Sequence, residues 1–143
     1  MLETKISEET AKLAKEKGFN LRFADFYCDN YKGLCTEHDE FLIVEDLDGV
    51  IYDCNNEFDE GERYYVTTQS LLQKWLREEH KIDIQILRNK PGYNEYKVEI
   101  YKTDEYSDHY LYFFIKEGGY VKWFSTYESA LESALKESLK LIQ

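Results

Sequence analysis

Four residues of the types that bind zinc lie in the first half of the chain: Cys28, Cys35, His38 and Cys54. Four nitrogen or sulfur ligands make a closed tetrahedral site, and the two-residue gap between Cys35 and His38 suits a pair of ligands. Cys28 and Cys54 lie at no typical ligand spacing, and the chain has no CxxC pair. Three thiols, an odd number, are typical of a reducing compartment. We therefore predict no metal site and no cofactor.

A second group of metal-binding side chains is acidic, and it comprises Asp53, Asn55, Glu57, Asp59 and Glu62. An EF-hand calcium loop requires glycine at its sixth position, where this chain has Phe58. The sequence excludes an EF-hand, while loose binding of a divalent cation stays open.

Residues that could perform catalysis form no recognisable pattern. The seven glycines make no phosphate-binding loop and no nucleophile elbow. The three histidines, His38, His80 and His109, are far apart in the sequence. His80 ends a predicted helix, where a positive charge is favourable. We predict no catalytic residue and no enzymatic activity.

The net charge of the chain comes from one segment. Of its 29 acids, 11 lie between Gly33 and Glu62, where there is no lysine or arginine, and the other 18 balance the 18 bases. A patch of one sign repels phosphate and attracts cations or basic protein surfaces. The alternative is an acidic face that is only solvated. The predicted partner-binding face consists of Asp46, Asp48, Asp53, Glu57, Asp59, Glu60 and Glu62.

The elements that position this segment are predicted as a helix over 7–18 followed by strands. Ser7 is a suitable N-cap, and Gly18 can end the helix with a positive φ. Strands are expected over 21–28, 41–45, 50–52 and 64–66, with a turn over 29–33. Asp48 and Gly49 indicate a hairpin between the second and third of these strands.

The clearest helix covers 67–80. Leu71, Leu72, Trp75 and Leu76 form one apolar stripe, and Thr67 or Thr68 can cap the N-terminus. We expect Trp75 and Leu76 to be buried against a sheet in the second half of the chain.

That sheet is predicted from alternating residues over 82–86 and 96–101. Residues 110–115 are apolar on both faces, which favours a central strand, and 120–124 are expected to form the last strand. A capping box at Ser125 and Glu128 predicts a final helix. Its apolar stripe consists of Tyr127, Leu131, Ala134, Leu135, Ser138, Leu139 and Ile142.

The predicted fold class is α+β, with helices packed on an antiparallel sheet. We expect a single domain over 1–143, with a short helix and a strand-rich acidic segment in 1–66. A helix–sheet–helix core is expected in 67–143. No apolar run is long enough for a membrane span, and the start lacks the apolar region of a signal peptide. We therefore expect a cytoplasmic protein with no membrane partner.

Helix, three strands and helix is also the outline of the double-stranded-RNA-binding domain. That family needs a lysine cluster at the start of its last helix, whereas residues 127–132 here are acidic. Tyr112 and Phe114 could stack on bases, but packing in the core explains them more simply. We predict no direct binding of nucleic acid.

Three stretches of the chain, 11–19, 68–82 and 126–142, resemble small uncharacterised proteins of phages and prophages of Bacteroidetes-type bacteria. The resemblance is lost across the acidic segment. It implies a phage-associated setting, such as host takeover or counter-defence, and it transfers no site residue.

The leading hypothesis from the sequence is a non-enzymatic binding or inhibitor protein whose acidic surface contacts a basic surface of a host protein. The alternative is a protein with an aromatic-lined pocket, which either sequesters a small molecule or catalyses an unrecognised reaction.

Overall fold

The computed structural model describes residues 3–21, 25–28, 31–38, 41–45, 51–53, 63–103 and 110–143. The chain forms two compact units. Lys5–Thr67 is called the N-terminal unit below, and Thr68–Gln143 together with Met1–Thr4 is called the C-terminal unit. The single domain over 1–143 stays a prediction.

The N-terminal unit begins with helix α1, Glu8–Glu16, as predicted. The Ser7 hydroxyl caps it by accepting a hydrogen bond from the Thr10 backbone N–H at 3.3 Å. Gly18 follows the helix with a φ of +99°, a conformation that glycine adopts without strain. The buried side of α1 carries Thr10, Ala11 and Ala14.

A five-stranded antiparallel sheet, in the order β4-β3-β2-β1-β5, forms the rest of this unit. Phe26 and Cys35 are opposite each other in the ladder and are both fully buried. The strands are β1 Asp25–Cys28, β2 Tyr31–His38, β3 Phe41–Glu45, β4 Ile51–Asp53 and β5 Arg63–Tyr65.

The predicted hairpin of β3 and β4 is confirmed, whereas the turn predicted over 29–33 is wrong at its end. Strand β2 already begins at Tyr31, because Cys28 pairs with Tyr31 and only two residues connect β1 to β2. Gly33 indicated a turn, but it lies within β2. Gly33 falls where the register between β1 and β2 shifts, between the pairs Phe26–Cys35 and Cys28–Tyr31, and such an irregularity is a position at which a strand accommodates glycine.

Helix α2, Gln69–His80, opens the C-terminal unit, and the hydroxyl of Thr68 caps it by accepting from Leu71 N–H at 3.3 Å. Leu72 and Leu76 are fully buried, as expected of the stripe. The expected burial of Trp75 is wrong, because its side chain is only half-buried. Trp75 lies at the border of the stripe, where its ring contacts His80 edge-on, with 4.6 Å between the centroids.

Three antiparallel strands follow: β6 Ile82–Arg88, β7 Tyr96–Thr103 and β8 Tyr110–Phe114. Their order is β6-β7-β8, so β8 is an edge strand, and the prediction of a central strand over 110–115 is wrong. The continuous apolar run was misleading because each face of β8 receives one of the adjacent rings, Phe113 and Phe114.

The segment after β8 leaves the sheet and returns to it. Residues Lys116–Glu117 (β9) and Tyr120–Val121 (β10) pair as a short hairpin, closed by a bond from Lys122 N–H to Ile115 C=O at 2.9 Å. Phe124 then exchanges two 2.8 Å backbone bonds with Tyr96 of β7. The strand predicted over 120–124 is therefore divided into β10 and an isolated bridge.

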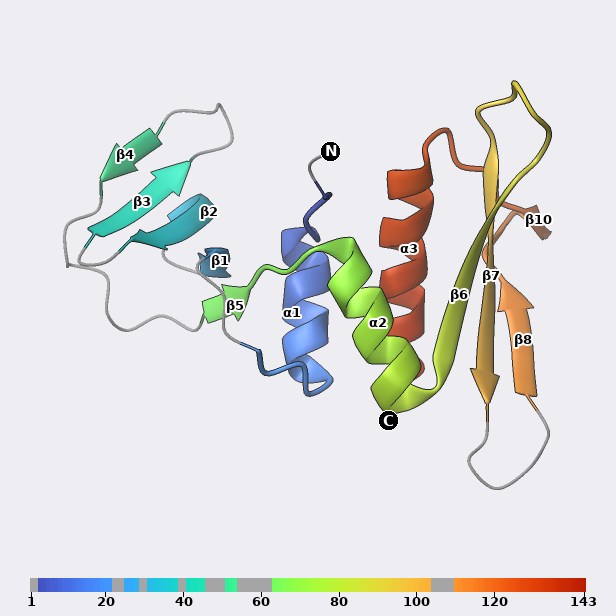
Figure 1. Cartoon of the computed structure of the whole chain (residues 1–143), viewed down its shortest axis with the longest axis horizontal. Coiled ribbons are helices and arrows are strands. Elements are labelled where there is room, and N and C mark those ends of the chain that lie inside the picture. The colour runs from blue at the N-terminus through green and yellow to red at the C-terminus, as the bar shows by residue number, and fades with distance from the viewer. Residues whose placement is uncertain are drawn as a thin grey trace. The chain divides into compact units, whose positions relative to one another are not determined.

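Helix α3, Tyr127–Leu139, packs beside α2 against β6 and β7. Its cap is Thr126, one residue after the predicted Ser125, and the Thr126 hydroxyl accepts from Ser129 N–H at 3.0 Å. The predicted stripe is buried except for Tyr127, whose ring lies edge-on to Tyr96. Figure 1 shows both helices on the same side of the sheet. Helices and antiparallel sheets confirm the α+β class.

Candidate functional site

The seven acids of the predicted partner-binding face occur in the sequence between the end of β3 and the start of β5. Asp53 is the last residue of β4, and its backbone pairs with Ile43 of β3. Asp46 and Asp48 follow β3 in the sequence, and the others follow β4. Six of these residues and the side chain of Asp53 lie outside the described part of the chain, so the face itself stays a prediction.

One acid of the N-terminal unit that the structure describes holds the unit together. The Asp25 carboxylate accepts a hydrogen bond from the Thr36 hydroxyl at 2.8 Å and forms an ion pair with Lys5. Next to Lys5, Ile6 N–H donates to Thr67 C=O at 3.0 Å. Asp25 thus ties the start of the chain to β1 and β2, which is a structural role.

Several cations of the same unit lie against aromatic rings. The ammonium groups of Lys12 and Lys15 lie 5.2 and 5.3 Å from the centroid of the Tyr64 ring. The Arg63 guanidinium lies 4.4 Å from the centroid of Phe26. At these distances the ring faces attract the cations, so α1 is fastened to β5 partly by charge.

Of the four possible zinc ligands, the structure describes one side chain, that of Cys35. Cys35 is a buried thiol and is not part of a disulfide. The side chains of Cys28 and His38, and all of Cys54, lie outside the described residues. Among the described residues, no group of three or more His, Cys, Asp and Glu side chains could hold a metal ion.

His80 is the last residue of α2, where a histidine was expected. Burial lowers the pKa of its imidazole, Glu79 raises that pKa, and Lys102 lowers it. Because burial is the largest of these effects, the fold favours the neutral ring, which packs on Trp75.

The C-terminal unit has an exposed surface that the sequence did not reveal. The helix side of the sheet carries Ile82, Ile84, Val98 and Ile100, all buried. Strand alternation places the intervening residues on the opposite side, which is called the open face below. Its residues are Asp83, Gln85, Leu87, Lys97, Glu99, Tyr101, Phe114 and Trp123.

Trp123 belongs to the open face because of the bridge between Tyr96 and Phe124. Phe124 is buried and pairs with Tyr96, so the adjacent Trp123 points to the other side and lies beside Lys97. The Trp123 and Leu87 side chains are 42% and 36% exposed. Phe114 is half-buried on this face rather than in the core, which corrects the expected role of its ring.

Charged groups lie among these apolar side chains. Glu99, near the centre, accepts a hydrogen bond from the Tyr101 hydroxyl at 3.0 Å and lies 3.8 Å from the Lys97 ammonium. The Lys116 ammonium lies 5.0 Å from the centroid of Phe114. The open face therefore combines aromatic rings with charges of both signs.

Comparison of the chain with protein-family models, with curated proteins and with solved structures found no match. Within the described residues, none of the helices has the length and apolar character needed to cross a membrane.

Proposed function

We propose that this protein is a non-enzymatic binding module that contacts a basic partner surface through the acidic segment between Gly33 and Glu62. One observation carries the proposal: the charge is sorted between the two compact units. Lys5–Thr67 contains 16 acids and 7 bases, a net charge of −9, so the rest of the chain carries the remaining −2 of −11. A field of one sign over one unit attracts partners of the opposite sign and raises their association rate.

Ion pairs within the N-terminal unit support this proposal. Lys5 pairs with Asp25, and Lys12 lies 3.3 Å from Glu8. Both acids lie outside the segment between Gly33 and Glu62. The unit has 7 bases against the 11 acids of the segment alone, so the segment has an acidic excess that the bases of its own unit are too few to neutralise.

The resemblance to phage proteins suggests a setting for such binding, namely host takeover or counter-defence in the cytoplasm of a bacterial host. A basic host protein surface, such as one that normally contacts phosphate groups, is the corresponding partner. The alternative of an aromatic-lined pocket for a small molecule stays a prediction that a ligand screen would test.

The test compares three baits in a bacterial lysate at low and high salt. One bait is the natural chain. The second has Asn or Gln in place of the acids at 46, 48, 53, 57, 59 and 60. The third exchanges Asp and Glu at the same six positions, which keeps the charge and is the matched control.

We expect the natural chain and the exchanged control to capture the same basic protein at low salt, and to lose it at high salt as screening increases. The neutralised variant should capture none of it, while its circular dichroism spectrum stays unchanged. Capture of the same protein by the neutralised variant would refute the proposal.

A further inference from the structure

The open face is a second surface suited to binding a partner. It belongs to the C-terminal unit, which has a net charge of only −2. It exposes Leu87 and Trp123 beside the half-buried rings of Phe114 and Tyr101. Exposed tryptophan and tyrosine residues are enriched at the centres of protein interfaces. Asp83 and Glu99 balance Lys97 and Lys116 on this face and at its rim, so another neutral surface can approach it without net repulsion.

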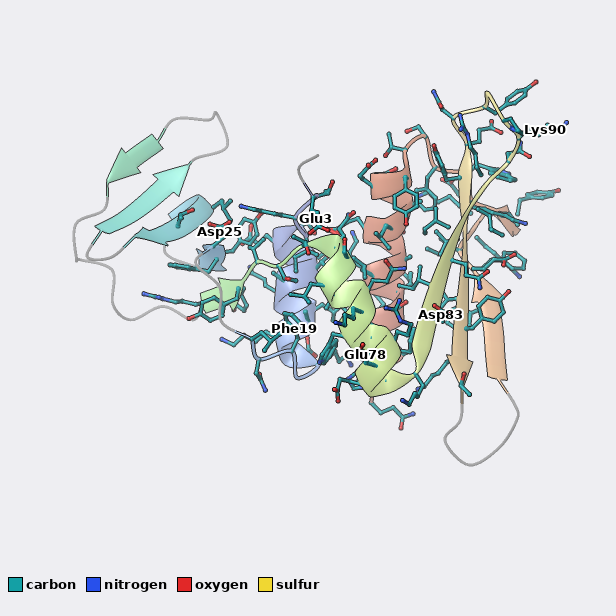
Figure 2. The ribbon with its side chains drawn as sticks, in the orientation of Figure 1. Glu3, Phe19, Asp25, Glu78, Asp83 and Lys90 are labelled. Atoms are coloured by element: carbon teal, nitrogen blue, oxygen red, sulfur yellow. The ribbon has the colours of Figure 1, made fainter. Side chains whose placement is uncertain are left out.

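The charges of the open face are arranged along the strands. Asp83 lies near the α2 end of β6, whereas Lys97 is the ladder partner of Leu87, four residues further along β6. Four residues of an antiparallel strand span about 13 Å. Figure 2 labels Asp83 on β6 and Lys90 in the turn at the far end of that strand. Asp83 thus lies at one end of the face, and Lys97, whose ammonium is 3.8 Å from Glu99, lies at the end near the turn.

Consider a two-fold axis that lies parallel to the sheet and perpendicular to its strands. It generates a second copy whose strands run in the opposite direction and whose open face is turned toward the first copy. Such an axis stacks the open faces of two copies and brings Asp83 of each copy to the Lys97 end of the other. We propose that a second copy of this chain docks on the open face in this way, with reciprocal Asp83–Lys97 contacts around Trp123 and Phe114. Self-complementary contacts of this kind close at two copies.

Features of the sheet edges favour stacking of faces over pairing of strands. The Thr103 N–H donates to Lys81 C=O, and the Asn89 N–H donates to Glu95 C=O. The odd-numbered residues of this edge therefore direct their backbone groups toward β7. The even-numbered residues of β6 direct theirs toward the outer edge of the sheet. The Gln73 side chain donates to one of them, Ile84 C=O, at 3.2 Å. On the other edge, the β9–β10 hairpin interrupts the strand. Both devices hinder the addition of another strand.

Three short strands, with neighbours about 4.8 Å apart, offer less area than a standard interface, so we expect a weak dimer that forms only at high protein concentration. Sedimentation velocity of the full chain over a wide concentration range measures its association constant. Trp123→Ala should weaken association at least about tenfold, as expected of a central aromatic residue. Leu21→Ala, at an exposed position of the N-terminal unit, should leave it unchanged.

Charge reversal provides the decisive experiment. Asp83→Lys alone and Lys97→Glu alone should each be monomeric, because like charges then face each other at both contacts. An equimolar mixture of the two variants should associate. In the mixed dimer, the Asp83→Lys chain is positive at residues 83 and 97, and the Lys97→Glu chain is negative at both. Each of the two contacts between residue 83 of one chain and residue 97 of the other therefore joins opposite charges again. Circular dichroism of each variant controls for folding.

A natural chain that stays monomeric at every concentration, or a mixture that stays monomeric, overturns the proposal. So does an association constant that Trp123→Ala leaves unchanged, or a dimer that is lost when the six acids between residues 46 and 60 are neutralised. Binding of a fluorescent single-stranded oligonucleotide that requires Trp123 would instead assign this face to nucleic acid. The proposed function of the acidic segment is independent of all these outcomes.

Discussion

Leu76→Ala tests whether α2 is the central packing element of the C-terminal unit. The Leu76 side chain is fully buried, so the substitution removes the equivalent of about three methylene groups from the core, at about 0.8 kcal/mol each. Because the surrounding side chains relax only partly, the remaining cavity adds a further cost per unit volume. We expect the free energy of unfolding to fall by roughly 3–4 kcal/mol, within the range measured for buried leucines.

The assay is urea unfolding followed by two signals. Both tryptophans, Trp75 and Trp123, lie in the C-terminal unit, so tryptophan fluorescence reports that unit alone, whereas circular dichroism reports both units. If residues 1–143 form a single domain, the two transitions coincide, and Leu76→Ala shifts both. If the units unfold separately, the substitution shifts the fluorescence transition and leaves part of the dichroism transition in place.

Leu87→Ala is the matched control, because it makes the same chemical change at an exposed position of the same unit. Its effect should be within about 1 kcal/mol of zero, as for most surface substitutions. The reasoning is refuted if Leu76→Ala costs no more than Leu87→Ala.

Three further predictions concern the pH dependence, the metal content and the helix caps. Burial lowers the pKa of His80 from its ordinary value of 6.5, so the neutral ring stabilises the fold above that pH. This contribution to the free energy of unfolding disappears as the pH falls through the lowered pKa. The free energies of unfolding of the natural chain and of His80→Gln should therefore converge in acid. A difference between them that stays the same at all pH values would contradict this. Elemental analysis of the purified protein should find no stoichiometric zinc, and one zinc per chain would overturn our interpretation of the cysteines. Thr126→Ala should lower the stability by about 1 kcal/mol, because it removes the cap of α3; Ser125→Ala, at the residue before it, should have almost no effect.

The helices were predictable because local sequence determines them. Ser7 and Thr68 cap the helices that they were expected to cap, and the apolar stripe that contains Leu131 and Leu135 is buried. These features depend on residues within one or two turns of each other. The cap of α3 was misplaced by one residue because Ser125 and Thr126 both carry a hydroxyl that can accept the capping bond.

Strand order was harder to predict because it depends on residues that are distant in the sequence. Nothing local in the apolar run of β8 indicates that the chain after it pairs with itself as β9 and β10 instead of adding a fourth strand. Tyr31 and Gly33 likewise have the composition of a turn, yet they lie in β2, which is stabilised by two neighbouring strands rather than by its own residues. The acids of the predicted face share only their charge, and six of the seven lie between the described strands in the sequence, where sequence periodicity offers no guide.

The open face is the feature that the alternation of residues in the sequence predicts least well, because alternation assigns Phe114 and Trp123 to opposite faces of the sheet. Phe114 and Trp123 are nine residues apart, an odd number, so a continuous strand would place their side chains on opposite faces. The β9–β10 hairpin removes this constraint: Phe114 pairs with Glu99, and the bridge at Tyr96 returns Trp123 to the position beside Lys97, two residues from Glu99. The two rings therefore lie on the same face, next to each other along the interrupted strand. A deletion that joined Ile115 directly to Trp123 would keep this arrangement, whereas a deletion with one residue more or fewer would turn Trp123 toward α3.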